Sequence, residues 1–174
     1  MKRRMKTLAV TLIFLLILSI SLVVTIKESS LKRGEGFAKE LMYYDSSGKK
    51  KYVISKNQPI VILVFNTMCK FCCYQLNILE SKADSISSFT MYLLSTDPLF
   101  FHKEVEQRWK KLRGTPACIF GLLDKSRLLD TVGKIYEPSI LFLSSDLQLY
   151  TLRRGVQSWQ EILRTVNASK HDML

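Results

Sequence analysis

Two cysteines separated by two residues stand at the junction between a predicted strand and a predicted helix. Cys69 and Cys72 follow an unbroken apolar run over residues 60–65, which predicts a strand buried on both faces. Apolar residues then recur every three or four positions, which predicts an amphipathic helix with its apolar face at Cys72, Leu76, Leu79, Ala83 and Ile86. The Cys-x-x-Cys pair therefore lies where a buried strand turns into a helix.

This position has a chemical consequence for the first cysteine. The N-terminus of a helix has unpaired N–H groups and a partial positive charge, and both favour a thiolate over a thiol. We therefore expect Cys69 to be the exposed, attacking thiol, with a pKa below that of a free cysteine. Cys72 would share the buried helix face and would resolve the mixed disulfide. The spacing and its context indicate thiol–disulfide redox chemistry.

Two other interpretations of the pair account for less of the sequence. Half of a structural zinc site would need a second Cys/His pair, and the remaining candidates, Cys118, His102 and His171, are isolated from one another. A pair of core cysteines would not explain why the motif falls at the strand-to-helix junction. No metal site is expected under the redox interpretation.

The charge of the chain is unevenly distributed. The 174 residues are 47% hydrophobic and have a net charge of +11, which fits one domain plus an appendage. Residues 1–34 hold 7 Lys/Arg and 1 acidic residue, whereas residues 35–174 hold 19 Lys/Arg and 14 acidic residues. More than half of the excess positive charge thus lies in the first 34 residues, a distribution that is typical of the flanks of a membrane segment. No dense basic stripe remains, so nucleic-acid binding is not expected.

The N-terminal segment predicts a membrane anchor. Residues 1–7 form a basic flank, and residues 8–26 have no charge over about 28 Å of helix, enough to cross a bilayer core. No clean Ala-x-Ala-like site follows, so we predict an uncleaved signal-anchor, with cleavage as the alternative. Residues 27–36 would be a tether, and residues 37–174 the folded domain. Basic residues on the cytoplasmic side would place this domain in the periplasm or extracytoplasmic space, on the inner (cytoplasmic) membrane.

The remaining pattern alternates strands and helices, which indicates an α/β fold. Asp45 to Gly48 predicts the turn of a β-hairpin. Further strands are predicted over residues 89–95, 117–123, 139–143 and 147–152. Helices are predicted from Asp97 to Leu112, over residues 125–132, and after a capping box formed by Ser158 and Glu161.

With these motifs in order, residues 37–168 resemble the thioredoxin-like thiol–disulfide oxidoreductases, and most closely their membrane-anchored extracytoplasmic (TlpA-like and Dsb-like) branch. Pro138 stands at the position of the family's cis-proline, and Gly155 at that of the glycine before the last helix. Pro116 competes for the first role, but only Pro138 is followed by the required strand, turn, strand, glycine and helix. The resemblance implies a thioredoxin-like fold, with a central mixed β-sheet flanked by helices and an N-terminal β-hairpin.

The resemblance also implies a function and a set of site residues. It implies a protein disulfide oxidoreductase without a cofactor, whose redox-active disulfide joins Cys69 and Cys72. The reductase direction is preferred, and the oxidase and isomerase directions are the alternatives. Pro138 would bind substrate. Lys70, Phe71 and Glu137 would modulate the site, and the charges of Lys70 and Glu137 would shift the pKa of Cys69 in opposite directions. Disulfide-containing extracytoplasmic proteins would be substrates of this membrane-tethered monomer, and a membrane electron-transfer partner would reduce it again.

Several residues depart from the family pattern and leave an alternative open. Met68 replaces the usual Trp, and Leu63 replaces the buried acid of thioredoxin itself. Cys69 and Cys73 form Cys-x-x-x-Cys, the spacing of Sco-type copper carriers, so the alternative is a thioredoxin-fold copper chaperone that uses these two thiolates. Cys73 is expected to be partly exposed and Cys118 to be a core cysteine. A purely structural adaptor is a third possibility.

Overall fold

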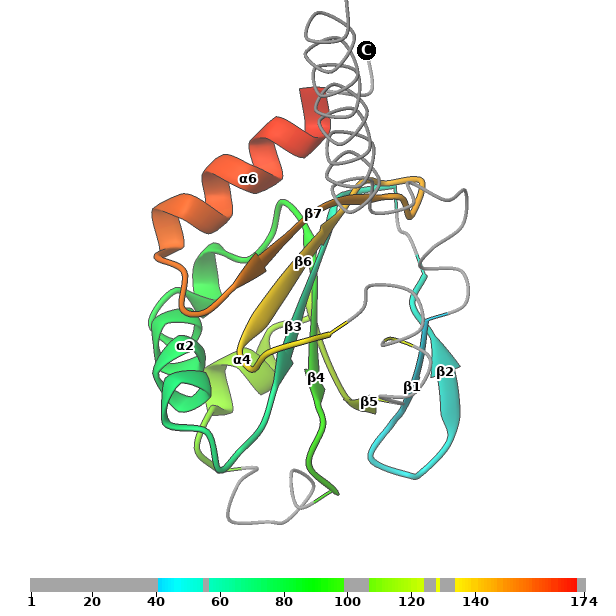
Figure 1. Ribbon diagram of the computed structural model, residues 1–174, viewed down its shortest axis with the longest axis vertical. Coiled ribbons are helices and arrows are strands. Elements are labelled where there is room, and N and C mark those ends of the chain that lie inside the picture. Colours follow the sequence, from blue (N-terminus) through cyan, green and yellow to red (C-terminus); the bar gives the residue numbers. More distant parts are fainter. Residues whose placement is uncertain (1–40, 55–56, 99–106, 124–127, 129–133, 172–174) are drawn as a thin grey trace, which may run out of the picture. The chain divides into compact units, whose positions relative to one another are not determined.

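A seven-stranded mixed β-sheet organises the part of the chain that the computed structural model describes, residues 41–171 without 55–56, 99–106, 124–127 and 129–133 (Figure 1). The strands are ordered β2-β1-β5-β4-β3-β6-β7. Their bounds are β1 Met42–Tyr44, β2 Lys50–Tyr52, β3 Ile60–Phe65, β4 Thr90–Ser95, β5 Cys118–Leu123, β6 Ser139–Leu143 and β7 Leu149–Arg154. The helices are α2 Lys70–Glu80, the 3₁₀ turn η2 Ala83–Ser85, α4 Lys110–Gly114 and α6 Trp159–His171.

Strand β3 lies at the centre of the packing. All six of its side chains are at most 1% exposed, as expected of a strand that is covered on both faces. Its odd-numbered residues, 61, 63 and 65, join one core cluster, and its even-numbered residues, 60, 62 and 64, join the other. It pairs with β4 in parallel and with β6 in antiparallel orientation. The predicted buried strand is confirmed.

Helices α2, α4 and α6 contribute to the same core cluster on one face of the sheet (Figure 1). The helix after the cysteines is shorter than its apolar pattern predicted, because α2 ends at Glu80 and Ile86 lies beyond η2. The Ser81 hydroxyl donates to the carbonyl oxygen of Ile78 at 2.7 Å, and such side-chain bonds compete with continued helix. Ala83 and Ile86 are nevertheless buried, so the pattern identified the correct face but not the end of the helix.

The predicted N-terminal hairpin is confirmed. One Asp45 carboxylate oxygen accepts hydrogen bonds from the N–H groups of Ser47 and Lys49, both at 2.9 Å. Gly48 has a φ of +73°, a conformation that glycine adopts without steric cost. The hairpin extends the sheet at its edge, because β1 pairs with β5 in antiparallel orientation. The sheet is therefore mixed, as the resemblance implied.

The later elements match the prediction with two shifts. The last hairpin strand begins at Leu149 instead of Leu147, whose φ of +69° belongs to the turn. Helix α4 begins at Lys110, so Trp109 lies in the preceding turn and outside the helix. The capping box of α6 is confirmed, because Ser158 N–H donates to Glu161 at 2.8 Å and Glu161 N–H donates to the Ser158 hydroxyl at 3.3 Å.

Several predictions fall on residues that the structure does not describe. Outside the described ranges lie the signal-anchor, the tether and the start of the domain at residues 37–40. Most of the helix predicted over residues 125–132 and residues 99–106 of the helix predicted from Asp97 also lie outside them. Within the described ranges, no helix is long and apolar enough to cross a membrane.

Replacing Gly121 with alanine should destabilise the fold by about 1–3 kcal/mol, the usual cost of overpacking. A Cβ atom at this position in β5 would lie 2.3 Å from a ring carbon of Tyr43, which packs edge-on against Tyr92. Urea unfolding of the full chain in detergent measures the effect. Gly114→Ala is the matched control, since no heavy atom lies within 4 Å of its Cβ. If Gly121→Ala lowers the free energy of unfolding just as much in a Tyr43→Ala background, the clash with the Tyr43 ring is not the cause.

Candidate active site

The turn between β3 and α2 holds Cys69 at the N-cap of the helix. Cys69 has an extended backbone conformation, and its sulfur accepts a hydrogen bond from the backbone N–H of Cys72 at 3.3 Å. Asn66 closes the turn, because its backbone oxygen accepts from Cys69 N–H at 3.2 Å and its side-chain oxygen accepts from Met68 N–H at 2.8 Å. The sulfur thus faces an N–H donor at a helix N-terminus, as the sequence predicted, but Cys69 is half-buried and not fully exposed as expected.

The loop before β6 faces the same sulfur. The Glu137–Pro138 peptide bond is cis, whereas no other cis bond occurs in the described ranges, which include Pro116. The Cys69 thiol donates to the backbone oxygen of Glu137 at 3.6 Å, and Gly155 N–H donates to the backbone oxygen of Pro138 at 2.8 Å. Three segments that are distant in the sequence therefore meet beside Cys69.

Cys72 lies directly beneath this surface and is fully buried. Burial raises the pKa of its thiol above the ordinary value, and a hydrogen bond to Cys69 and the negative charge of Glu137 raise it further. Cys72 is therefore protonated at neutral pH, while its hydrogen bond keeps it in contact with the Cys69 sulfur. All four cysteines are free thiols in this structure.

The other two cysteines lie outside this contact. Cys73 is half-buried, as predicted, and its thiol donates to the backbone oxygen of Thr67 at 3.4 Å. Cys118 packs against the core at the start of β5 but is half-buried. Burial and the charge of Glu80 raise the pKa of Cys118 to about 12. Among the described residues, no group of three or more His, Cys, Asp or Glu side chains could hold a metal ion.

Two carboxylates are tied to the β3–α2 turn by threonines that sequence reasoning missed. The Glu137 carboxylate accepts a hydrogen bond from the Thr96 hydroxyl at 2.5 Å, and Thr96 N–H donates to the backbone oxygen of Phe65 at 2.8 Å. The Thr67 hydroxyl donates to the Asp97 carboxylate. Thr67 follows the carboxyl end of β3, and Thr96 follows that of the parallel strand β4. Folds of the α/β class place binding sites at these strand ends, and that position is the signal that could have found the two threonines.

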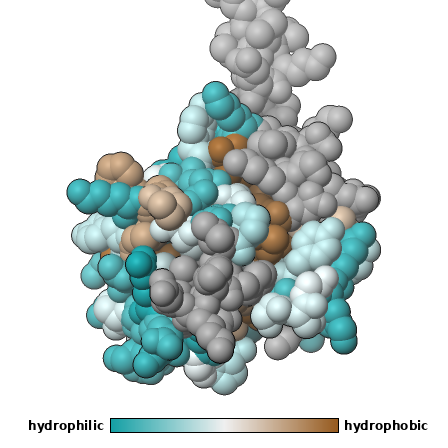
Figure 2. All heavy atoms as spheres, turned by 90° about the horizontal axis from the view of Figure 1, so that it is seen from below, coloured by the Kyte–Doolittle hydropathy of each residue, from teal (hydrophilic) through white to brown (hydrophobic). Residues whose placement is uncertain are grey.

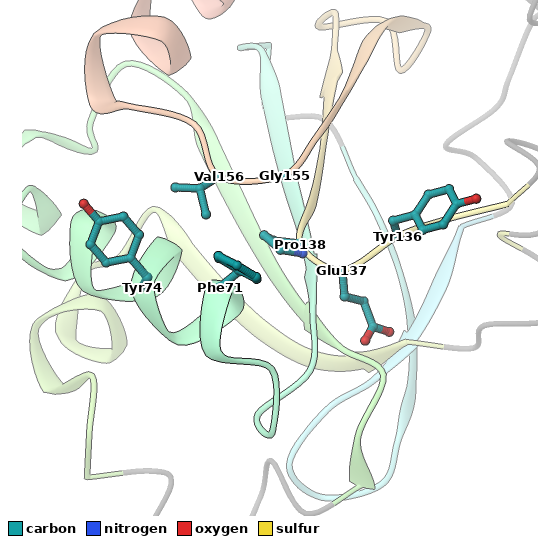
Figure 3. Close-up of a pocket in the computed structure, with 7 residues that line it drawn as sticks. All are labelled: Phe71, Tyr74, Tyr136, Glu137, Pro138, Gly155 and Val156. Carbon is teal, nitrogen blue, oxygen red and sulfur yellow. The ribbon is translucent and has the colours of Figure 1, made fainter.

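An open cavity of about 470 Å³ lies beside the cysteines (Figure 3). Phe71 and Val156 lie on the α2 side of Pro138, with Tyr74 beyond them, whereas Tyr136 lies on the opposite side of Pro138. Glu137 and Gly155 complete the lining. Phe71, Tyr74 and Tyr136 are 66%, 60% and 51% exposed. On the face of the molecule that Figure 2 presents, some apolar side chains lie among polar ones. Exposed apolar side chains gathered around a cavity are typical of an interaction site.

Gln75, which sequence reasoning also missed, ties α2 to the loop that follows β7. This side chain is fully buried on α2. Its oxygen accepts from Gln157 N–H at 2.7 Å, and its amide donates to the Gln157 backbone oxygen at 3.2 Å. The two bonds fix the loop that carries Val156 over the cavity. A glutamine among the apolar positions of a helix was the available signal, because a buried amide needs partners.

The fold is thioredoxin-like, and solved structures of other proteins share it. No family model and no curated protein matches the sequence. Solved structures match with TM-scores above 0.5. DsbF of Mycobacterium tuberculosis has a TM-score of 0.59 at 16% identity, over 76% of this chain and 97% of that chain. The exposed lipoprotein thioredoxin Etrx1 of Streptococcus pneumoniae has a TM-score of 0.55 at 16% identity, over 73% of this chain and 97% of that chain.

A secreted Mycobacterium tuberculosis disulfide oxidoreductase homologous to Escherichia coli DsbE is also similar. Its TM-score is 0.55 at 15% identity, over 73% of this chain and 94% of that chain. These likenesses confirm the fold expected from the resemblance. They span nearly the whole of each solved chain, so the likeness extends over the whole fold of those proteins.

Alkylation of the reduced, folded protein should distinguish the four thiols. At pH 8 we expect iodoacetamide to modify Cys69 and Cys73 first, whereas Cys72 and Cys118 remain protonated because their pKa values are raised. Modification of Cys118 should accelerate as pH rises toward 12, since the thiolate is the reacting form. Peptide mass spectrometry reads each site. The same reaction in 8 M urea is the control, where all four should react alike. Preferential modification of Cys72 in the folded protein would contradict this assignment.

Gln75→Ala should destabilise the fold by about 1–3 kcal/mol, because it leaves the backbone N–H and carbonyl of Gln157 without their side-chain partners. Urea unfolding of the full chain in detergent measures the loss. Gln160→Ala on the exposed side of α6 is the matched control and should change the free energy of unfolding by less than about 0.5 kcal/mol. Equal effects of the two variants would show that the paired hydrogen bonds do not hold the loop.

Proposed function

We propose that this protein is a thiol–disulfide oxidoreductase that acts on protein disulfides through Cys69 and Cys72. One observation carries the proposal. The Cys69 sulfur, at a helix N-terminus, lies against the fully buried Cys72 thiol on one side and the Glu137–Pro138 loop on the other. Solved structures with the same fold support it, because one is described as a disulfide oxidoreductase and another as a thio-disulfide isomerase.

In the proposed reaction, the Cys69 thiolate attacks one sulfur of a substrate disulfide. A bond forms between Cys69 and that sulfur, and the other substrate sulfur leaves as a thiolate. Cys72 then loses its proton and attacks the Cys69 sulfur, so the bond between Cys69 and the substrate breaks and the second substrate sulfur leaves as a thiolate. The released substrate thiolates take up two protons in all, one of them equivalent to the proton lost by Cys72. Two electrons pass to the substrate, and the protein is left with a Cys69–Cys72 disulfide. An external dithiol donor must reduce this disulfide before the next cycle.

The neighbouring residues have proposed supporting roles. Pro138, which is buried between Cys69 and Gly155, would align the substrate backbone. The exposed Lys70 would favour the Cys69 thiolate, whereas the charge of Glu137, which reaches Cys72, would disfavour the Cys72 thiolate. Phe71 would supply apolar contact to the substrate in the cavity.

The cellular setting is proposed from the N-terminal sequence and from what similar structures are. Residues 8–26 would tether a monomeric domain to the inner membrane, on its extracytoplasmic side. An exposed lipoprotein thioredoxin and a secreted oxidoreductase with the same fold support an extracytoplasmic location. Substrates would be disulfide-bearing proteins of that compartment, and a membrane electron-transfer partner would return the pair to the dithiol. The reductase direction is proposed from the family resemblance.

Cys72→Ser should trap substrate proteins on Cys69 as mixed disulfides, because the resolving thiol is lost. Non-reducing gel electrophoresis followed by mass spectrometry of the full-length protein, expressed in its membrane, reads the complexes. Cys69→Ser should trap none, and the matched control Cys73→Ser should cycle like the unmodified protein. If Cys72→Ser traps nothing but still binds Cu(I) through Cys69 and Cys73, the copper chaperone replaces the proposal.

The direction of electron flow follows from the reduction potential of the Cys69–Cys72 pair. Equilibration of the full chain in glutathione or dithiothreitol buffers should give a value near or below about −230 mV, in the range of thioredoxin and glutaredoxins. A value of about −120 to −180 mV would instead make the protein an oxidant or isomerase.

A further inference from the structure

The cavity beside Cys69 is lined by different side chains at its two ends. At the α2 end, the walls are the rings of Phe71 and Tyr74. Tyr136 stands at the opposite end, beyond Pro138 (Figure 3). Pro138 and Val156 line the cavity between the two ends. A segment bound across the cavity would therefore contact apolar surface near the cysteines and would reach Tyr136 further along.

Two cations lie against the ring of Tyr136. The ammonium nitrogen of Lys134 is 5.3 Å from the centre of the ring, and the guanidinium carbon of Arg154 is 5.5 Å from it. Arg154 also donates a hydrogen bond to the backbone oxygen of Lys134 at 3.5 Å, so both cationic residues belong to one cluster. Both side chains are exposed to solvent. Positive charge stacked on an aromatic ring at a cavity mouth suits a carboxylate that arrives with an apolar side chain.

The acidic residue of the cavity faces elsewhere. The Glu137 side chain points away from Phe71 and Val156 in Figure 3, and its carboxylate accepts the hydrogen bond from Thr96. The backbone oxygen of Glu137 contacts the Cys69 sulfur, and the negative charge of its carboxylate acts on the Cys72 thiol. An acidic substrate residue should therefore be tolerated poorly next to the substrate cysteine and well a few residues away, over Tyr136.

We propose that Tyr136, Lys134 and Arg154 form a specificity-determining subsite, which selects disulfide substrates with an apolar residue beside the cysteine and acidic residues a few positions away. This inference rests on the proposed function and names the substrate class of the same site. The apolar residue occupies the space between Phe71, Pro138 and Val156. The acidic residues pair with the cations at the far end. The subsite changes the rate of encounter and capture, and leaves the chemistry of the two sulfurs unchanged.

Two cyclic peptides test the subsite, each closed by one disulfide and carrying a fluorophore and quencher that separate on reduction. They are identical, with leucine beside the first cysteine, except for Asp-Asp or Lys-Lys two residues further out. The reduced full chain in detergent should reduce the Asp-Asp peptide about fivefold faster at low salt, the ratio given by a favourable surface ion pair. The ratio should fall as salt is added, because salt screens exposed charges.

Arg154→Glu and Lys134→Glu should each abolish or invert this preference. Lys82→Glu is the matched control, because it changes the net charge equally at an exposed position beyond the C-terminal end of α2. It should leave the ratio of the two rates unchanged. The uncharged hydroxyethyl disulfide should react at the same rate with all of these variants.

The outcomes separate the two proposals. Equal rates for the two peptides, or the same change of ratio in Lys82→Glu as in Arg154→Glu, would overturn the subsite while leaving the redox function intact. Failure of the unmodified protein to reduce either peptide or hydroxyethyl disulfide would overturn the proposed function, and the subsite with it.

Discussion

The burial of β3 on both faces is the constraint on which the position of the reactive sulfur depends. Its side chains alternate between two core clusters, and its backbone pairs with β4 on one side and β6 on the other. A slip of one residue would move every side chain to the opposite cluster, so the register is strongly determined. The end of the strand at Phe65 is fixed as a result. Asn66 then closes the turn that places Cys69 at the start of α2.

The site itself is assembled from segments that are held to one another by hydrogen bonds. The Cys69 thiol contacts the backbone of Glu137, and Gly155 contacts the backbone of Pro138. Gln75 fixes the next part of the same loop by bonding to both backbone groups of Gln157. The cavity exists because these contacts hold the loops before β6 and after β7 against the first turns of α2. Its shape is thus a property of the junction between the elements.

The electrostatics of the pair suggest an order of events in the proposed reaction. Leu63 is fully buried in the core cluster that contains Cys72. The family resemblance implies that it stands where thioredoxin itself has an acid. The carboxylate whose charge reaches Cys72 is that of Glu137, from the cavity side. The contact with Cys69 also raises the pKa of Cys72. Once Cys69 enters a mixed disulfide, its thiolate charge is gone, so Cys72 can lose its proton more readily when it is needed as the resolving thiol.

The sequence alone was sufficient for features encoded within a few neighbouring residues. Apolar periodicity predicted β3 and the buried face of α2, and turn chemistry predicted the hairpin around Asp45 and Gly48. The capping box predicted the start of α6. Pro138 was found by the order of the elements that follow it, which is also a property of the sequence. These features were predictable because each depends on local propensity or on a short, ordered pattern.

Other features were decided only by the tertiary structure. Gln75 and Gln157 are 82 residues apart, and Thr96 and Glu137 are 41 residues apart, yet each pair is hydrogen-bonded. The cavity likewise joins α2 to loops that are distant in the sequence. The early end of α2 and the placement of Trp109 outside α4 also differ from the periodic pattern. Such contacts depend on how whole strands and helices pack. They cannot be predicted from a local sequence pattern, because only the folded sheet brings these distant segments together.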